Sequence, residues 1–231
     1  FADNTHAKEA AMLGIPYKSI FAGQVQIGER MVDGNQLKWS VFHDFPAEKM
    51  YANMQELVFP FMKNLHGNKE SAYSKYMGDA IFKVPTPLML DKIVNALDGV
   101  YEQMEQLKKA DTRGDVYEYL LSKLATAGVN GQFRTPRHII RMIVDMMQPK
   151  PDDVICDPAC GTSGFLVTAS EYLRENCKKE VLFDKANKDH YMNHMFHGYD
   201  MDRTMLRIGA MNMMTHGVEN PSIEYRDSLS D

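Results

Sequence analysis

The sequence has few cysteines, no long apolar run and no excess of basic residues, and each shortage excludes a class of protein. Three cysteines in 231 residues are too few and too unevenly placed for a disulfide framework, so we expect a protein of a reducing compartment, the cytoplasm. No apolar run approaches the roughly 20 residues that a membrane-spanning helix needs, and the first residues lack the basic and apolar regions of a signal peptide. We therefore expect no membrane partner and no export.

The charge balance limits how this chain could bind nucleic acid. Lys and Arg number 26 and Asp and Glu 31, which gives a formal net charge of −5. A protein that binds a phosphate backbone unaided normally carries an excess of positive charge. If nucleic acid is the substrate, another subunit must supply much of the positive surface. The length and the 44% hydrophobic content allow one large domain or two small ones, each with a real core.

The N-terminal half has the pattern of helices. Periodicity is weak over 1–45, but apolar residues recur at helical spacing over 47–66, 90–107 and 115–125. We expect Pro60 to kink or divide the first of these helices. Methionine and aromatic residues at this spacing are usually core, so we interpret them as core instead of a ligand pocket. The pattern predicts an all-helical N-terminal half.

From Gly128 onward the sequence predicts alternating helices and strands. Pro136 is expected in the first turn of a helix that continues to Met147. The elements that follow are a strand at 153–156, a helix beginning near Ser163, a strand ending at Asp200, a helix at 203–216 and a strand at 223–225. This alternation is typical of a parallel sheet with right-handed crossovers.

Two features of this half are less well defined by the pattern. The polar region 176–197 is interpreted as a loop with one or two helical turns. We place the domain boundary between residues 114 and 115, which gives a helical N-terminal domain, 1–114, and an α/β domain, 115–231. A boundary near Gly128 is the alternative.

The stretch 154–165, Val-Ile-Cys-Asp-Pro-Ala-Cys-Gly-Thr-Ser-Gly-Phe, has the features of a cofactor site. An apolar run ends in Asp157 and passes into a glycine turn and a helix, which is how α/β proteins present a nucleotide-like ligand at a strand end. Gly161 permits a sharp turn and Gly164 permits close packing where the helix begins, which Thr162 or Ser163 is expected to cap. The Gly-x-x-Gly spacing alone could equally be a structural turn.

Three acidic residues, Asp157, Asp200 and Asp227, stand at or just beyond the ends of the three predicted strands. In a doubly wound sheet these ends form one crevice, so the carboxylates would converge on one ligand. Carboxylates only accept hydrogen bonds, which suits a ligand with an ammonium group, ribose hydroxyls and an exocyclic amine. Each Asp alone could instead be a helix cap or a turn residue.

Other nucleotide cofactors fit this stretch less well. A P-loop needs Lys and Ser or Thr after its second glycine, whereas Phe165 and Leu166 follow here. A dinucleotide fold expects a complete Gly-x-Gly-x-x-Gly and an acidic residue about 20 positions further on, but Asp200 comes 43 residues after Asp157. ATP and NAD are therefore disfavoured.

His190, His194 and His197 have a spacing that could place three imidazoles on one helix face as zinc ligands. No acidic base is placed among them as in His-Glu-x-x-His, and they lie in a polar region. We interpret them as solvated histidines and assign no metal site.

Three motifs in order carry a resemblance to a known family. Residues 157–165, Asp-Pro-Ala-Cys-Gly-Thr-Ser-Gly-Phe, resemble the S-adenosylmethionine motif of the γ-class amino-methyltransferases, and 130–137, Asn-Gly-Gln-Phe-Arg-Thr-Pro-Arg, resemble the motif that precedes it. With 115–121, this order is similar to the modification subunit of type I restriction-modification systems. The resemblance implies a helical N-terminal domain followed by the first half of a doubly wound, Rossmann-like methyltransferase sheet.

The resemblance also implies roles for residues around the cofactor. The methionine end would be held by the preceding motif, with Phe133 lining the pocket and Thr135 bonding the carboxylate; its residues are Gln132, Phe133, Arg134, Thr135, Pro136 and Arg137. Asp157 would face the ammonium group, Asp200 the ribose hydroxyls and Asp227 the N6 of the cofactor adenine. Close backbone approach would come from the glycine turn, formed by Gly161, Thr162, Ser163 and Gly164.

The activity implied is methyl transfer from S-adenosylmethionine to adenine N6 in DNA, with a specificity subunit and a restriction subunit as partners. The helical half is expected to contact a partner or DNA. The alternatives are a binding module without catalysis and a methyltransferase that acts on RNA or protein.

The family's catalytic motif, Asn or Asp followed by Pro-Pro and an aromatic residue, does not occur between Asp227 and Asp231, the last residue of the chain. In the family this motif holds a flipped target adenine. We therefore expect the motif to lie beyond Asp231 and the chain to be a fragment. We assign no catalytic residue.

Overall fold

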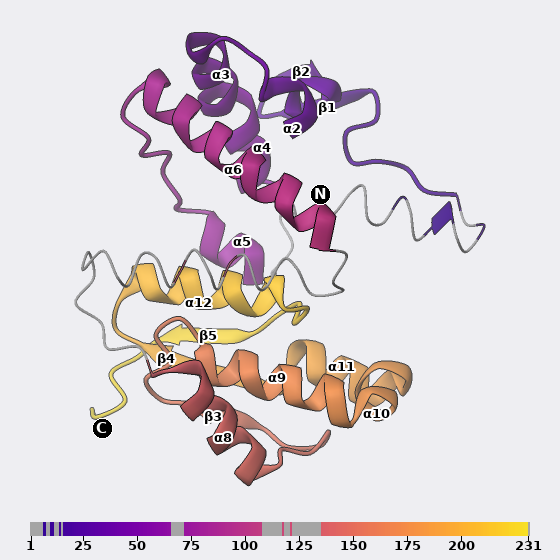
Figure 1. Cartoon of the computed structure of the whole chain (residues 1–231), viewed down its shortest axis with the longest axis vertical. Helices are drawn as coiled ribbons and strands as arrows, with labels where there is room; N and C mark the ends of the chain where they lie inside the picture. Colours follow the sequence, from indigo (N-terminus) through magenta and orange to yellow (C-terminus); the bar gives the residue numbers. More distant parts are fainter. Residues whose placement is uncertain are drawn as a thin grey trace. The chain divides into compact units, whose positions relative to one another are not determined.

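The computed structural model describes residues 16–65, 72–107 and 135–230, together with Ala7, Ala10, Ala11, Gly14, Tyr117 and Leu121. These residues belong to two compact units, which are described one at a time (Figure 1). None of the helices in the described part of the chain is both long and apolar enough to cross a bilayer.

The first unit is mainly helical. Its elements are β1 (Gln24–Ile27), β2 (Arg30–Asp33), η1 (Gly34–Leu37), α2 (Trp39–Phe42), α3 (Ala47–Asn53), η2 (Met54–Val58), α4 (Phe59–Lys63) and α6 (Pro87–Leu107). The antiparallel hairpin of β1 and β2 corrects the prediction of an all-helical half. The residues of β1 alternate, Gln-Val-Gln-Ile, but the alternation covers only four residues and β2 does not continue it, so the sequence pattern was too short to predict the hairpin.

The predicted helix over 47–66 is divided before Pro60, as expected. The chain passes from α3 into the π-helical η2 and then into α4, which has Pro60 in its first turn. Proline has no N–H to donate to a carbonyl in the preceding turn, and the wider π turn accommodates that loss. The apolar stripe forms core, as predicted, because Met50 and Val58 are buried with Leu90 and Val94 of α6.

The second unit contains a three-stranded parallel sheet in the order β3-β4-β5, as the alternation predicted. The strands are β3 (Ile155–Asp157), β4 (Phe196–Asp200) and β5 (Ser222–Tyr225). The helices are α5 (Ala72–Met77), α8 (Arg137–Met147), α9 (Gly164–Asn176), α10 (Lys178–Phe183), α11 (Lys185–Asn193) and α12 (Arg203–Thr215). Contacts join α8 to α9, α9 to α12 and α12 to α5, so these four helices form a continuous row.

The prediction that 176–197 is mainly a loop is wrong. This region forms α10 and α11 before β4 begins at Phe196. The Asp184 side chain accepts hydrogen bonds from the backbone N–H groups of Ala186 and Asn187, which caps the start of α11. Helix α10 contributes one buried side chain to the core, Val181, and α11 contributes one, Tyr191. One anchor per short helix gives no periodic pattern, which is why the sequence suggested a loop.

Helix α5 lies between α4 and α6 in the sequence but belongs to the second unit. The Arg207 side chain of α12 donates through Nε to the Tyr76 carbonyl at 2.9 Å, and the Tyr76 hydroxyl donates to the carbonyl of Ile223 in β5. Burial raises the pKa of Tyr76 to about 12, so this hydroxyl stays protonated as a donor at neutral pH. The predicted division between 114 and 115 would separate α5 from the unit on which it packs.

Candidate functional site

The loops that follow the three strands are tied together at the carboxyl edge of the sheet. The Cys160 N–H donates to the Tyr199 carbonyl at 2.9 Å, and the Arg226 N–H donates to the Asp200 carbonyl at 3.2 Å. The Ser228 hydroxyl donates to the Pro158 carbonyl at 2.5 Å. Since Asp157 and Asp200 end β3 and β4, and Asp227 follows β5 by two residues, all three stand on this edge.

Asp200 holds the glycine turn. Its Oδ2 accepts from the Gly161 N–H at 3.0 Å, and its Oδ1 accepts from the Asp202 N–H at 2.7 Å. Gly161 has a φ of +50°, the sharp turn predicted for this glycine, and the space where a Cβ would point is open. A ligand could therefore approach the backbone here closely.

Asp157 is a partly buried carboxylate beside Asp200. Its Oδ1 accepts from the Ala159 N–H at 3.1 Å. Burial raises the pKa of Asp157, the charge of Asp200 raises it further, and the Ala159 hydrogen bond opposes both effects. A positively charged ligand group would relieve this unfavourable concentration of negative charge.

Asp227 lies in an exposed turn. Its Oδ1 accepts from the Leu229 N–H at 3.0 Å, and the neighbouring Arg226 guanidinium stacks on the Tyr199 ring, 5.0 Å from the ring centroid. The turn is thus fixed both to itself and to the end of β4.

The description of this turn ends at Ser230. Asp231, the residue beyond which we expect the catalytic motif, lies outside the described residues. The structure therefore tests neither the expected position of the motif nor the expectation that the chain is a fragment, and both stay predictions.

The prediction that Thr162 or Ser163 caps the next helix is wrong. Ser163 occupies the N-cap position of α9, but its φ of +61° turns the side chain inward and it makes no capping hydrogen bond. The Ser163 side chain is fully buried against α12, where a Cβ on Gly209 would lie 2.5 Å from its Oγ. Asn212 of α12 donates to the Thr162 carbonyl at 2.8 Å, so α12 supports the whole turn.

The motif that precedes β3 is only partly described. Gln132, Phe133 and Arg134 lie outside the described residues, whereas Thr135 and Pro136 are exposed and directly precede α8. The Arg137 guanidinium donates to Glu171 of α9 at 2.8 Å. Its charge is thus already engaged by a carboxylate.

The three histidines of the zinc alternative do not converge. The His190 ring is hydrogen-bonded through Nε2 to the Asp153 carbonyl at 2.8 Å, and the His197 ring through Nε2 to the His194 carbonyl at 2.9 Å. Over the described ranges, no three His, Cys, Asp or Glu side chains form a group that could hold a metal ion. Burial raises the pKa of Cys160 to about 12, so this thiol beside the site is protonated and unreactive.

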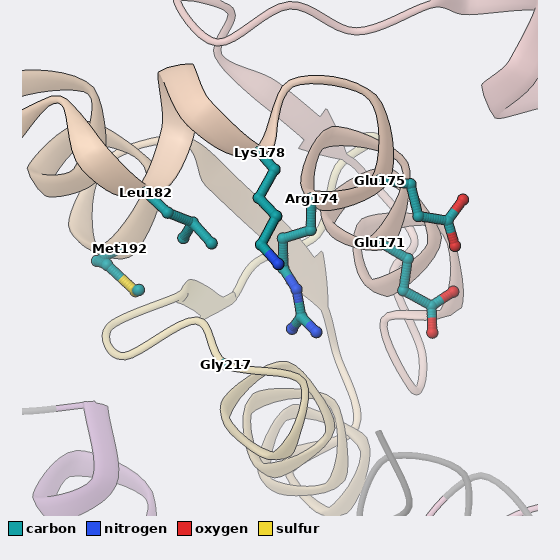
Figure 2. A pocket seen from close by; sticks show the side chains of 7 residues that line it. All are labelled: Glu171, Arg174, Glu175, Lys178, Leu182, Met192 and Gly217. Atoms are coloured by element: carbon teal, nitrogen blue, oxygen red, sulfur yellow. The ribbon is translucent and has the colours of Figure 1, made fainter. Parts of the chain in front are cut away.

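A pocket of about 440 Å³ lies away from this edge, where α9 ends and α10 begins (Figure 2). It is lined by Glu171, Arg174, Glu175, Lys178, Leu182, Met192 and Gly217. Met192 and Gly217 lie in segments that lead into β4 and β5, so the pocket is at the amino ends of these strands. Its residues come from four separate segments, and no sequence motif indicated it.

Comparison with known proteins supplies an independent line of evidence. The profile of the N-6 DNA Methylase family matches residues 108–231. The EcoEI methylase subunit of a type I restriction enzyme from Escherichia coli is 28% identical over 189 residues, which cover 81% of this chain and 36% of that protein. The StySPI methylase subunit from Salmonella potsdam is 31% identical over 156 residues, with 64% and 30% coverage.

The fold has solved counterparts. A crystal structure of a modification subunit from Vibrio vulnificus YJ016 superposes with a TM-score of 0.64 and 21% identity, over 98% of this chain and 47% of that one. The chain spans about a third of the length of the curated relatives that it matches.

Proposed function

Because this chain belongs to the N-6 DNA methylase family, we propose that its strand-end carboxylates bind S-adenosylmethionine and that the whole protein methylates adenine N6 in DNA. One observation carries the proposal. Asp157, Asp200 and the Gly161 turn form one hydrogen-bonded and electrostatically coupled group at the carboxyl edge of a parallel sheet. This is the position at which open α/β sheets bind their ligands.

The carboxylates suit the donors of this cofactor. Asp157 would face the ammonium group, whose positive charge would offset the burial and the repulsion by Asp200 that raise the pKa of Asp157. Each oxygen of Asp200 accepts one backbone hydrogen bond and can accept a second, so both remain available to ribose hydroxyls. Asp227 would accept from the N6 of the cofactor adenine.

Ser163 would act only through its backbone, since its side chain is buried. Gly161, Thr162 and Gly164 complete the turn, and Gly164 allows α8 to pack closely, since a Cβ there would lie 3.2 Å from the Ile140 side chain. The cofactor, when bound, supplies an activated methyl group; this chain orients it.

For the methionine end we propose Gln132, Phe133, Arg134, Thr135 and Pro136. Arg137 has a different role in this proposal. Because its guanidinium is bound to Glu171, it would position the start of α8, and therefore the preceding loop, instead of contacting the cofactor. None of the described residues is assigned to the target adenine.

DNA is the proposed substrate, and a specificity subunit and a restriction subunit are the proposed partners, because the matched relatives are methylase subunits of type I restriction enzymes. The net charge of −5 supports a separate subunit for sequence-specific DNA binding.

Calorimetric titration of the 231-residue chain with S-adenosylmethionine tests the site. Asp157→Ala and Asp200→Ala should each weaken binding by at least about tenfold, because each removes a charge-assisted hydrogen bond. The matched control is Glu224→Gln, which removes a negative charge from an exposed residue of β5 that has no role in the proposed site. This variant should bind the cofactor as the parent does. Binding that is unchanged in both Asp variants would overturn the assignment.

A further inference from the structure

The pocket at the amino ends of β4 and β5 combines two cations with an apolar wall. Arg174 comes from the last turn of α9 and Lys178 begins α10, while Leu182 and Met192 come from α10 and α11. Figure 2 shows the Arg174 and Lys178 side chains next to each other, with their nitrogens directed toward Gly217 and with Leu182 and Met192 to one side.

The Arg174 side chain is held in place. Its Nη1 donates to the carbonyl of His216, at the C-terminal end of α12, at 2.5 Å. Gly217 has a φ of +87°, which favours glycine, and a Cβ there would crowd the guanidinium, since it would lie 3.2 Å from the same Nη1. Lys178, by contrast, is exposed and makes no ion pair or hydrogen bond with the residues that the structure describes.

Among the residues that the structure describes, the two acidic residues of the pocket form no ion pair with Lys178. Glu171 accepts from Arg137 at 2.8 Å and Glu175 from Arg141 at 2.6 Å, so each carboxylate is paired with an arginine of α8. In Figure 2 both carboxylates are turned away from Lys178. Arg174 and Lys178 both line the pocket, so an anion bound in it would interact with both cations.

We propose that this pocket binds a phosphate monoester attached to a flat or apolar body, such as a nucleoside monophosphate. A phosphate monoester carries a charge of about −1.5 to −2 at neutral pH. Two adjacent cations therefore match a phosphate ligand better than they match a carboxylate ligand, which carries a single negative charge. Arginine offers a planar fork and lysine a point charge, and both bind phosphate. The Met192 thioether and the Leu182 side chain give an apolar surface for the body of the ligand.

The size and position of the pocket agree with this class of ligand. Its volume of about 440 Å³ lies within the range of roughly 300–1,000 Å³ that is typical of small-molecule sites. It lies at the amino ends of the strands, whereas the proposed cofactor site lies at their carboxyl ends, so the two sites do not share a residue. Failure of one proposal therefore leaves the other standing.

The test is a titration of the 231-residue chain with uridine 5′-monophosphate, followed by calorimetry and amide chemical shifts. This probe lacks adenine, which distinguishes it from the proposed cofactor. We expect saturable binding, which Lys178→Glu weakens by at least about tenfold. The matched control is Lys179→Glu, the same charge reversal on the adjacent exposed residue that does not line the pocket, and it should change affinity less than about twofold.

Two further probes separate the parts of the ligand. Uridine, which lacks the phosphate, and inorganic phosphate, which lacks the body, should both bind at least about tenfold more weakly than the monophosphate. The proposal is overturned by equal effects of the two lysine variants, by equal binding of uridine, or by no saturable binding of the monophosphate. Unchanged melting temperatures of both variants show that folding is not the cause.

Discussion

The two ends of the parallel sheet carry opposite charge and are built in different ways. At the carboxyl end, Asp157, Asp200 and Asp227 each accept a backbone N–H of their own loops, so the chain itself fixes the anions. At the amino end, Arg174 is fixed by a backbone carbonyl and Lys178 lies beside it. A cationic ligand group suits the first end and an anion the second.

This difference indicates how the same three strands could present the two binding surfaces that we propose. Backbone donors accumulate where strands pass into helices through tight turns, and backbone carbonyls accumulate where helices end before strands. The carboxylates use the first set and the guanidinium uses the second. Substitutions that affect one end and not the other can therefore test the comparison.

The largest effect is expected from Gly209→Ala in α12. The new Cβ would lie 2.5 Å from the buried Ser163 Oγ and 2.9 Å from the Gly161 carbonyl, so the glycine turn must shift. We expect a loss of about 1–3 kcal/mol in the free energy of unfolding and loss of S-adenosylmethionine binding, measured by urea titration and calorimetry. Uridine 5′-monophosphate binding should remain.

The matched control is Gly99→Ala in α6, where, apart from its own helix backbone, no atom of the described residues lies within 4 Å of the new Cβ. Alanine favours the helix by up to about 1 kcal/mol, so this variant should be as stable as the parent or more stable. Normal cofactor binding by Gly209→Ala would contradict the close packing of α12 under the turn.

The next largest effect is expected from Asp200→Asn. The amide keeps the size of the side chain but removes the charge and one acceptor, so cofactor affinity should fall by about 10- to 100-fold in calorimetric titration. The same variant should bind uridine 5′-monophosphate as the parent does. A parallel loss of both ligands would show that the two ends are not independent.

A smaller effect is expected from pH through Asp157. Because burial and Asp200 raise the pKa of Asp157 above its ordinary value of 3.8, its charge is lost at a higher pH than that of a typical Asp. Affinity for the cofactor ammonium should therefore fall as pH is lowered toward this range, measured as the dissociation constant against pH. Asp157→Asn should remove this part of the pH dependence.

The same pKa shift predicts a change in stability of the opposite sign. The folded pKa of Asp157 lies above the unfolded value, so its contribution to stability declines as pH rises through the folded pKa. Without cofactor at neutral pH, Asp157→Asn should be slightly more stable than the parent, by less than about 1 kcal/mol. A less stable variant in urea titration would contradict this account.

The smallest effect is expected from Arg137→Ala, which removes the ion pair between the start of α8 and Glu171 of α9. Cofactor affinity should fall by up to about fivefold, because the start of α8 loses a surface ion pair. Arg141→Ala breaks the neighbouring pair with Glu175, one turn further along α8, and should leave cofactor affinity unchanged. Arg137→Lys should restore part of the loss; equal losses in both alanine variants would argue against a positioning role.

Much of the second unit could be predicted because its signals are local. Pro136 and Gly217 mark a helix start and a helix end, a short apolar run before Asp157 marks one strand, and a short run that ends at Asp200 marks the next. Parallel pairing then places the two strand ends on one edge. The roles of the site residues in cofactor binding remain predictions.

The features that sequence reasoning missed depend on contacts between distant residues. The inward turn of Ser163 depends on the absence of a side chain at Gly209, and the pocket depends on four segments that meet only in the fold. Helices α10 and α11 have one buried anchor each, too few for a periodic pattern. For the inward turn of Ser163, the sequence offered one cue: a small residue, Gly209, inside the predicted helix over 203–216.

Helix α5 has a consequence for the order in which the protein forms during synthesis. The Tyr76 hydroxyl bonds a carbonyl that lies 147 residues further along the chain. At a translation rate of about 5–20 residues per second, α5 leaves the ribosome roughly 7–30 s before its acceptor strand β5 is made. Helix α12, which also packs on α5, is made only shortly before β5, so the native surroundings of α5 form long after α5 itself has been made.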